Sequence, residues 1–174
     1  MYPSKAELLT DWLELLRSGQ YQQTRNVLYD GEGYCCLGVA AEGIFNVEWE
    51  QSNNDWFEYS VGNEYACDNE LIGSHAEALG LEREVTEEET KVYSGIVEFI
   101  VEDWEEDAQS EILATLHDMS DDTSRETWLI LLNDAGFSFD DIAQFVTLAG
   151  WIPEAKAEER IAKLAALTQE MEAE

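Results

Sequence analysis

The stretch SKAELLTDWLELLRSG, residues 4–19, carries the start, the apolar face and the end of a helix in one continuous run. Ser4 followed by Glu7 is a capping box, whose side chains satisfy backbone N–H groups at a helix start. Arg17-Ser18-Gly19 is typical of a helix end. Large apolar residues recur between them at helical spacing, namely Leu8, Trp12, Leu15 and Leu16. We therefore predict an N-terminal amphipathic helix.

The chain that follows this helix predicts strands and turns. Asn26 to Asp30 and Tyr34 to Leu37 flank the turn Gly31-Glu32-Gly33, which predicts a β-hairpin leading into a short apolar helix through Phe45. From Val47 to Ala66, aromatic residues alternate loosely with polar ones. Turn signals interrupt this segment, at Asn53-Asn54 and at Gly62-Asn63. This second pattern predicts a small antiparallel sheet.

The second half of the chain predicts helices. A short helix from Leu71 to Leu79 should end at Gly80. Three further helices should begin at capping boxes, formed by Thr86 with Glu89, Thr123 with Glu126 and Ser138 with Asp141, and the last two should end near Gly136 and Gly150. The expected fold class is α+β: an N-terminal helix with a small antiparallel sheet, followed by a mainly helical second half.

We expect residues 1–152 to form a single acidic domain, because a chain of 174 residues commonly folds around one core. Residues 153–174 are expected to form a C-terminal helix that starts after Pro153. Its apolar residues would let it dock on the domain or pair with a second copy in a homodimer. They are Ile161, Leu164 and Leu167.

Negative charge dominates the composition. The chain has 39 Asp and Glu against nine Lys and Arg, a formal net charge of -30. A compact chain of this length has a radius of gyration of roughly 16 Å and a body on the order of 40 Å across. Because B-DNA carries one charge per about 1.7 Å of its axis, thirty charges correspond to about 50 Å of duplex. The protein therefore matches DNA of its own size in charge, which excludes direct nucleic-acid binding through a basic surface.

Several classes of protein are disfavoured by the same composition. The hydrophobic fraction of 45%, with six Trp, seven Tyr and six Phe, is too high for a disordered acidic tail. No basic stretch precedes an apolar run at the N-terminus, and no apolar segment approaches bilayer length. We therefore expect a cytoplasmic protein without a membrane contact.

The residues that most often carry chemistry form no catalytic or metal-binding pattern. His75 and His117 lie in no arrangement with a nucleophile, and no glycine-rich phosphate loop is present. The three cysteines lack metal-ligand spacing, and Cys35 and Cys36 are expected on opposite sides of a strand, with Cys67 the third. We expect no enzyme activity, no metal and no cofactor; a hydrolase with paired carboxylates is the remaining enzymatic alternative.

A run of carboxylates forms the candidate partner-binding surface. Between Glu82 and Asp107, eleven acidic residues stand against only Arg83 and Lys91. One continuous helix is predicted through residues 97–112, with its apolar face opposite a carboxylate stripe that includes Glu98, Glu102, Glu105 and Glu106. The eleven acidic residues are Glu82, Glu84, Glu87, Glu88, Glu89, Glu98, Glu102, Asp103, Glu105, Glu106 and Asp107.

Two blocks of sequence carry a resemblance to known proteins. Residues 16–21 (LRSGQY) lead to residues 33–39 (GYCCLGV), and residues 132–136 (LNDAG) lead to residues 138–143 (SFDDIA). These blocks resemble those near the two ends of small, uncharacterised proteins carried by bacteriophages and prophages. The resemblance covers about a quarter of the chain and implies no catalytic role. The acidic middle and the C-terminal helix depart from that pattern.

Charge and resemblance together suggest a function. We expect a phage-type DNA mimic of the anti-CRISPR or antirestriction class, whose carboxylates replace phosphates in the basic channel of a host nucleic-acid-binding protein. The alternative is a non-catalytic adaptor whose acidity serves solubility or adaptation to salt. Trp49, Trp56 and Tyr59 are a second candidate contact surface.

Overall fold

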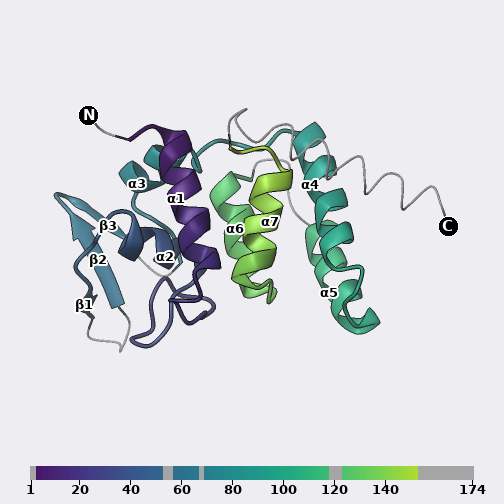
Figure 1. Ribbon diagram of the computed structural model, residues 1–174, viewed down its shortest axis with the longest axis horizontal. Helices are drawn as coiled ribbons and strands as arrows, with labels where there is room; N and C mark the ends of the chain where they lie inside the picture. The colour runs from purple at the N-terminus through teal and green to yellow at the C-terminus, as the bar shows by residue number, and fades with distance from the viewer. Residues whose placement is uncertain (1–2, 53–56, 67–68, 118–122, 153–174) are drawn as a thin grey trace.

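The computed structural model describes residues 3–52, 57–66, 69–117 and 123–152, and confirms the α+β class (Figure 1). The sheet lies at one end of the fold, and α4 and α5 lie at the other (Figure 1). The elements are α1 (Lys5–Arg17), α2 (Cys36–Gly43), β1 (Glu50–Gln51), β2 (Phe57–Val61), β3 (Glu64–Ala66), α3 (Gly73–Leu79), α4 (Glu87–Ile100), α5 (Glu106–His117), α6 (Arg125–Asp134) and α7 (Phe139–Leu148).

Helix α1 is the predicted N-terminal helix, and it packs against α2, α3 and α7. Its capping box is present, since Ser4 Oγ accepts from the backbone N–H of Glu7 at 3.3 Å and the Ser4 N–H donates to the Glu7 carboxylate at 2.7 Å. The core-facing side of α1 carries Leu9, Trp12, Leu13 and Leu16, while the predicted Leu8 and Leu15 are only half-buried. The buried face of α1 is therefore rotated from the predicted one, with Leu9 and Leu13 buried in place of Leu8 and Leu15.

The hairpin predicted between Asn26 and Leu37 is reduced to one antiparallel bridge, which is closed across the predicted turn by the Asp30 N–H donating to the Gly33 carbonyl at 3.2 Å. The structure has only isolated bridges here, which join Tyr34 to Tyr29 and to Gln23. The short apolar helix predicted after it is α2, which starts earlier than expected because Cys35 acts as its N-cap and accepts from the Gly38 N–H at 3.3 Å through its sulfur. Cys35 and Cys36 consequently do not alternate on a strand, and both are buried.

Close packing of α2 explains why a glycine stands at its third position. A Cβ atom at Gly38 would lie 1.9 Å from the backbone carbonyl oxygen of Leu28. That carbonyl also accepts from the Cys35 N–H at 3.0 Å, so it cannot move away without breaking the turn into α2. The helix therefore begins directly against the preceding loop.

The side-chain amide of Asn133 joins three segments of the fold, and it is 1% exposed. Its Oδ1 accepts from Gln23 Nε2 at 3.0 Å and from the backbone N–H of Cys36 at 3.2 Å. Its Nδ2 donates to the carbonyl oxygen of Thr24 at 2.9 Å and to Asp134 Oδ1 at 3.2 Å. All four hydrogen-bonding positions of the amide are thus used.

The same contacts bring residues 33–39 next to residues 132–136, through the bond from the Cys36 N–H to Asn133. Gln23 Nε2 also donates to the Phe137 carbonyl at 2.7 Å, and the Asn26 N–H donates to Asp134 Oδ1 at 2.8 Å. Asn26 has a φ of 65°, which residues other than glycine rarely adopt but which asparagine adopts more readily than most, and this second bond fixes its backbone N–H there. These contacts therefore join the end of α6 to the loop at residues 23–26 and to the start of α2.

The small antiparallel sheet has the order β1-β2-β3, as the sequence predicted. Glu50 pairs with Glu58, Ser60 pairs with Tyr65, and the β2–β3 turn contains Gly62 at a φ of 64°. Asn53-Asn54 lie outside the described residues. Tyr59 projects from this sheet into the core, where its hydroxyl accepts from the Ile72 N–H at 3.3 Å.

The capping signals of the second half are mostly confirmed. Thr86 caps α4 with Glu89, Ser138 caps α7 with Asp141, and Gly80 ends α3 at a φ of 71°. The predicted start of α6 is shifted by one residue, because its N-cap is Ser124, which accepts from Thr127 N–H at 3.2 Å. The glycines expected after α6 and α7 both have positive φ, 99° at Gly136 and 73° at Gly150.

An aromatic cluster holds α4, α6 and α7 together, and Trp151, which follows α7, belongs to it. Tyr93 makes edge contacts with Trp128, Phe145 and Trp151, and its hydroxyl accepts from Trp151 Nε1 at 2.7 Å. Arg125 lies over the Trp151 ring, 4.9 Å from its centre. Residues 153–174 lie outside the described residues. No helix among the described residues is long and apolar enough to cross a membrane.

We predict that Asn133→Ala lowers the free energy of unfolding by about 2–4 kcal/mol, because it leaves the buried Cys36 N–H and the partly buried Thr24 carbonyl without a partner. Urea denaturation followed by tryptophan fluorescence measures the change. The matched control is Asn63→Ala at the exposed β2–β3 turn, with an expected change within about 0.5 kcal/mol. Equal losses in the two variants would contradict the role assigned to the Asn133 amide.

Candidate functional site

The eleven predicted carboxylates lie on the surface, but they do not form one helical stripe. Ten are exposed, and Glu89 is half-buried. Helix α4 ends at Ile100, and α5 begins at Glu106, so the continuous helix predicted through residues 97–112 is broken. Of the four residues assigned to its outer face, Glu98 lies on α4, Glu102 and Glu105 lie on the connection, and Glu106 begins α5.

Charge and packing both explain the break. Glu102 and Asp103 would place negative charge at the C-terminal end of α4, where the helix dipole disfavours it, whereas Glu106 and Asp107 stabilise the first turn of α5. Trp104 turns inward and packs on Phe137, with ring centres 4.8 Å apart. A continuous helix would lose both arrangements.

A single glutamine side chain closes the end of α4. Gln109 Nε2 donates to the carbonyl oxygens of Val101 and Glu102, at 2.6 and 2.8 Å. These are carbonyls that the ended helix leaves without intrahelical partners. The connection between α4 and α5, residues 101–105, is therefore fixed by α5 itself, and the two helices lie side by side (Figure 1).

Three of the eleven carboxylates are neutralised by neighbours. Glu82 lies 3.7 Å from Lys5, Glu87 lies 2.6 Å from Lys91, and Glu89 lies 2.8 Å from Arg83. Burial raises the pKa of Glu89, but the Thr86 and Arg83 hydrogen bonds together lower that pKa below its ordinary value. Glu89 is committed to the α4 capping box, so it is not a free contact for a partner.

The other eight carboxylates form no ion pair with any described residue. Five of them fall within residues 102–107, a surface that we term the α4–α5 acidic cluster. Its members are Glu102, Asp103, Glu105, Glu106 and Asp107. Glu84 and Glu88 lie near the start of α4, and Glu98 lies in its last turns. The strongest candidate surface is thus a rigid connection rather than a helix face.

In the second candidate surface, the two aromatic residues that the structure describes are not exposed. Tyr59 is 1% exposed and belongs to the core, and Trp49 is half-buried and donates to Glu42 at 2.7 Å. Trp56 lies outside the described residues. The two described aromatic residues therefore stabilise the sheet region and do not present a contact surface.

The histidine and cysteine side chains that the structure describes are packed. His75 lies against Phe45, with ring centres 3.8 Å apart, and its Nδ1 is 3.1 Å from the Tyr59 hydroxyl. Burial lowers the pKa of His75 and raises the pKa of the Cys36 thiol. Among the residues that the structure describes, no three His, Cys, Asp or Glu side chains are placed to hold a metal ion.

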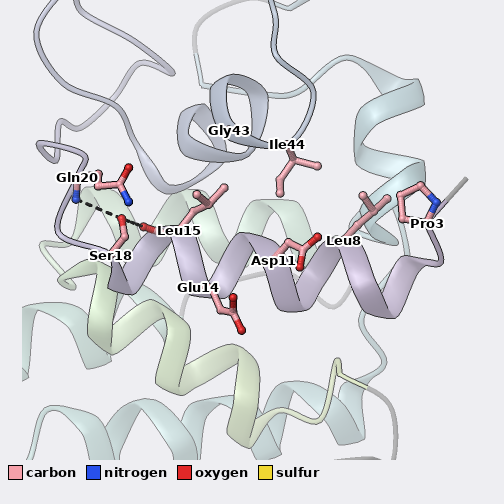
Figure 2. A pocket seen from close by; sticks show the side chains of 9 residues that line it. All are labelled: Pro3, Leu8, Asp11, Glu14, Leu15, Ser18, Gln20, Gly43 and Ile44. Carbon is pink, nitrogen blue, oxygen red and sulfur yellow. Dashed lines mark hydrogen bonds between the residues drawn. The ribbon is translucent and has the colours of Figure 1, made fainter.

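A groove between α1 and the end of α2 escaped the sequence analysis, and its volume is about 530 Å³ (Figure 2). Apolar side chains along α1 and at the end of α2 line it, together with two carboxylates of α1. The lining residues are Pro3, Leu8, Asp11, Glu14, Leu15, Ser18, Gln20, Gly43 and Ile44. The sequence feature that could have indicated this groove is the pair Asp11 and Glu14, because both lie on the side of the predicted helix that carries no core residue.

Glu126 has a role that the sequence assigned wrongly. It was expected to close a capping box with Thr123, but its Oε1 accepts from the backbone N–H of Leu71 at 2.8 Å. Burial raises the pKa of Glu126 to about 7, and the nearby carboxylates of Glu70 and Glu82 add to the rise. The group is therefore partly protonated near neutral pH.

A family model described as Domain of unknown function (DUF8296) matches residues 4–149. The match runs from the N-cap of α1 to the C-cap of α7, so it contains every described helix and strand and stops before residue 153. No curated protein and no solved structure matches the chain.

We predict that Glu126→Gln becomes more stable than the natural chain as pH rises from 5 to 8. Because the folded pKa of about 7 lies above the ordinary 4.5, ionisation of Glu126 removes stability as pH passes through that interval, by up to about 3 kcal/mol. Glutamine keeps an acceptor for the Leu71 N–H. Urea unfolding at several pH values measures the difference, with Glu88→Gln on the exposed first turn of α4 as the control for loss of one charge. A difference that stays constant across this range would contradict the assignment.

Proposed function

The chain belongs to the family described as Domain of unknown function (DUF8296), and we propose that it acts as an acidic DNA mimic. In this role it is a stoichiometric, non-catalytic inhibitor that occupies the nucleic-acid-binding site of a host defence or DNA-processing protein, in the manner of the anti-CRISPR or antirestriction class. It requires no cofactor and acts in the cytoplasm of the host cell. The α4–α5 acidic cluster, within a chain of net charge -30, is the observation that carries the proposal.

The density of free carboxylates along α4 supports the proposal. The eight carboxylates without an ion pair among the described residues extend from Glu84, before α4, to Asp107, after it. The 14 residues of α4 span about 21 Å at 1.5 Å per residue. B-DNA carries about 12 charges over the same length of axis. Because the eight carboxylates extend beyond both ends of α4, this edge of the protein has less than two-thirds of the charge density of duplex DNA.

The rigidity of the cluster also favours recognition by a phosphate-binding channel. Gln109 holds the α4–α5 connection through two backbone carbonyls, and Trp104 anchors it against Phe137. A basic partner then meets a connection whose backbone is already ordered, so less loop entropy is lost on binding. Long-range attraction by the net charge would speed association at low salt.

A non-catalytic adaptor is the second candidate function, and exposed apolar residues favour it. Tyr65 is 72% exposed and Val61 is 46% exposed, and both lie beside the β2–β3 turn. This apolar tip lies at the sheet end of the fold, away from α4 and α5 (Figure 1). A partner bound there would depend on apolar contact, and its affinity would be insensitive to salt.

We predict that converting the α4–α5 acidic cluster to carboxamides weakens binding to the basic partner by at least about tenfold at low salt, since five rim charges at a few tenths of a kcal/mol each reach that factor. The variant carries Glu→Gln at 102, 105 and 106 and Asp→Asn at 103 and 107. Proteins retained from a host lysate by the immobilised full chain are eluted with salt or with duplex DNA, identified and purified, and their affinity for each variant is measured.

The matched control removes five exposed carboxylates elsewhere, so that the net charge is equal. These are Glu32, Glu48, Glu50, Glu77 and Asp140. Equal losses of affinity in the two variants would mean that the net charge of the protein, and not the position of the cluster, determines binding. A partner that resists high salt, ignores duplex DNA and is lost on Tyr65→Ser would reject the DNA mimic and support the adaptor.

A further inference from the structure

The groove beside α1 combines an apolar wall with a negatively charged rim. Leu8 and Leu15 line it from α1, and Ile44 faces them from the end of α2 (Figure 2). Asp11 and Glu14 lie on the same helix, are exposed, and form no ion pair with any described residue. The groove therefore suits an amphipathic segment whose apolar side chains are flanked by cations.

The chain itself contains a segment of that kind. Residues 153–174 lie outside the described residues, and their sequence concentrates three of the nine Lys and Arg of the whole protein within residues 156–163. At helical spacing, Lys156 and Lys163 border one edge of the stripe formed by the apolar residues of this segment, and Arg160 lies within the stripe. The apolar residues are Ile161, Leu164 and Leu167.

The spacing of the charges is the same on both sides. Asp11 and Glu14 are three residues apart on α1, and Arg160 and Lys163 are three residues apart in the segment. In two helices that run parallel, such pairs rise by the same distance, about 4.5 Å at 1.5 Å per residue. Each cation can then face one carboxylate.

The path of the chain is consistent with a parallel run. Trp151 is buried against Tyr93 and Phe145, which fixes the point from which the segment leaves the domain. The chain leaves α7 at the end of the fold where α1 begins (Figure 1). Two extended steps from Ile152 to residue 154, followed by six helical steps to Arg160, reach up to about 16 Å. This exceeds the length of about 9 Å along α1 from its first residue, Lys5, to Asp11.

We propose that the C-terminal segment, residues 154–168, docks as a helix along α1 over this groove, with Arg160 facing Asp11 and Lys163 facing Glu14. The docked helix covers Leu8, Leu15 and Ile44 and neutralises the free carboxylates of α1. It leaves the α4–α5 acidic cluster uncovered. The proposal does not depend on the proposed function, because it concerns contacts within one chain.

Zero-length coupling of the natural full chain tests this docking directly. A carbodiimide joins a lysine amine to a carboxylate only when the two are in contact, and mass spectrometry locates the bond. We expect Lys163 to be joined to Glu14 or Asp11. A mixture of ¹⁵N-labelled and unlabelled protein distinguishes the source of the segment: bonds between two isotopes would place a second copy in the groove and overturn the proposal, as would coupling of Lys163 only to other carboxylates.

A charge-reversal cycle in the full chain provides an independent measurement. Asp11→Lys with Glu14→Lys, or Arg160→Glu with Lys163→Glu, should each lower the hydrogen-exchange protection of residues 160–168 by about tenfold, because two attractive pairs become repulsive. Combining all four substitutions should restore the protection. The control, Glu102→Lys with Asp103→Lys, makes the same change in net charge as the first pair and should leave the protection unchanged. Absence of rescue in the combined variant would overturn the pairing.

Discussion

The buried amide of Asn133 is the contact on which the arrangement of the two halves of this fold depends. It lies at the end of α6, and its four hydrogen bonds reach the loop at residues 23–24, the first residue of α2 and the adjacent Asp134. The Cys36 N–H would otherwise be buried without compensation, at a cost of about 1–3 kcal/mol, and the other three partners are partly buried. The N-terminal part and the helical second half are thus joined by one side chain as well as by apolar packing.

A chain of net charge -30 folds because most of its carboxylates stay in water and several stabilise helices. Five of the seven described helices carry acidic residues in their first turn, where the helix dipole favours negative charge, namely α1, α4, α5, α6 and α7. The break between α4 and α5 follows the same rule. Without the break, the carboxylates of residues 102–107 would lie at the C-terminal end of α4, where negative charge is unfavourable. With the break, Glu106 and Asp107 lie in the first turn of α5, where negative charge is favourable.

The candidate surfaces follow from this distribution of charge. The α4–α5 acidic cluster has no neutralising neighbour among the described residues, whereas Glu82, Glu87 and Glu89 meet Lys5, Lys91 and Arg83. If the C-terminal segment covers α1 as proposed, the positive charge of the chain is used internally and the α4–α5 edge remains the most negative surface for a partner. The fold would then concentrate the unpaired negative charge of an acidic chain at one edge.

Local signals in the sequence determined the fold class and most helix boundaries. Capping boxes at Ser4, Thr86 and Ser138 and the glycines after α3, α6 and α7 act within a few residues of one another, so their structures do not depend on distant parts of the chain. The composition likewise determined that the surface is acidic. Only the tertiary structure decided that Cys35 begins a helix, that Glu126 bonds to Leu71, and that the predicted stripe is two helices held by Gln109. Those outcomes depend on partners distant in sequence or on a competition between helix continuation and packing, which periodicity along one segment cannot resolve.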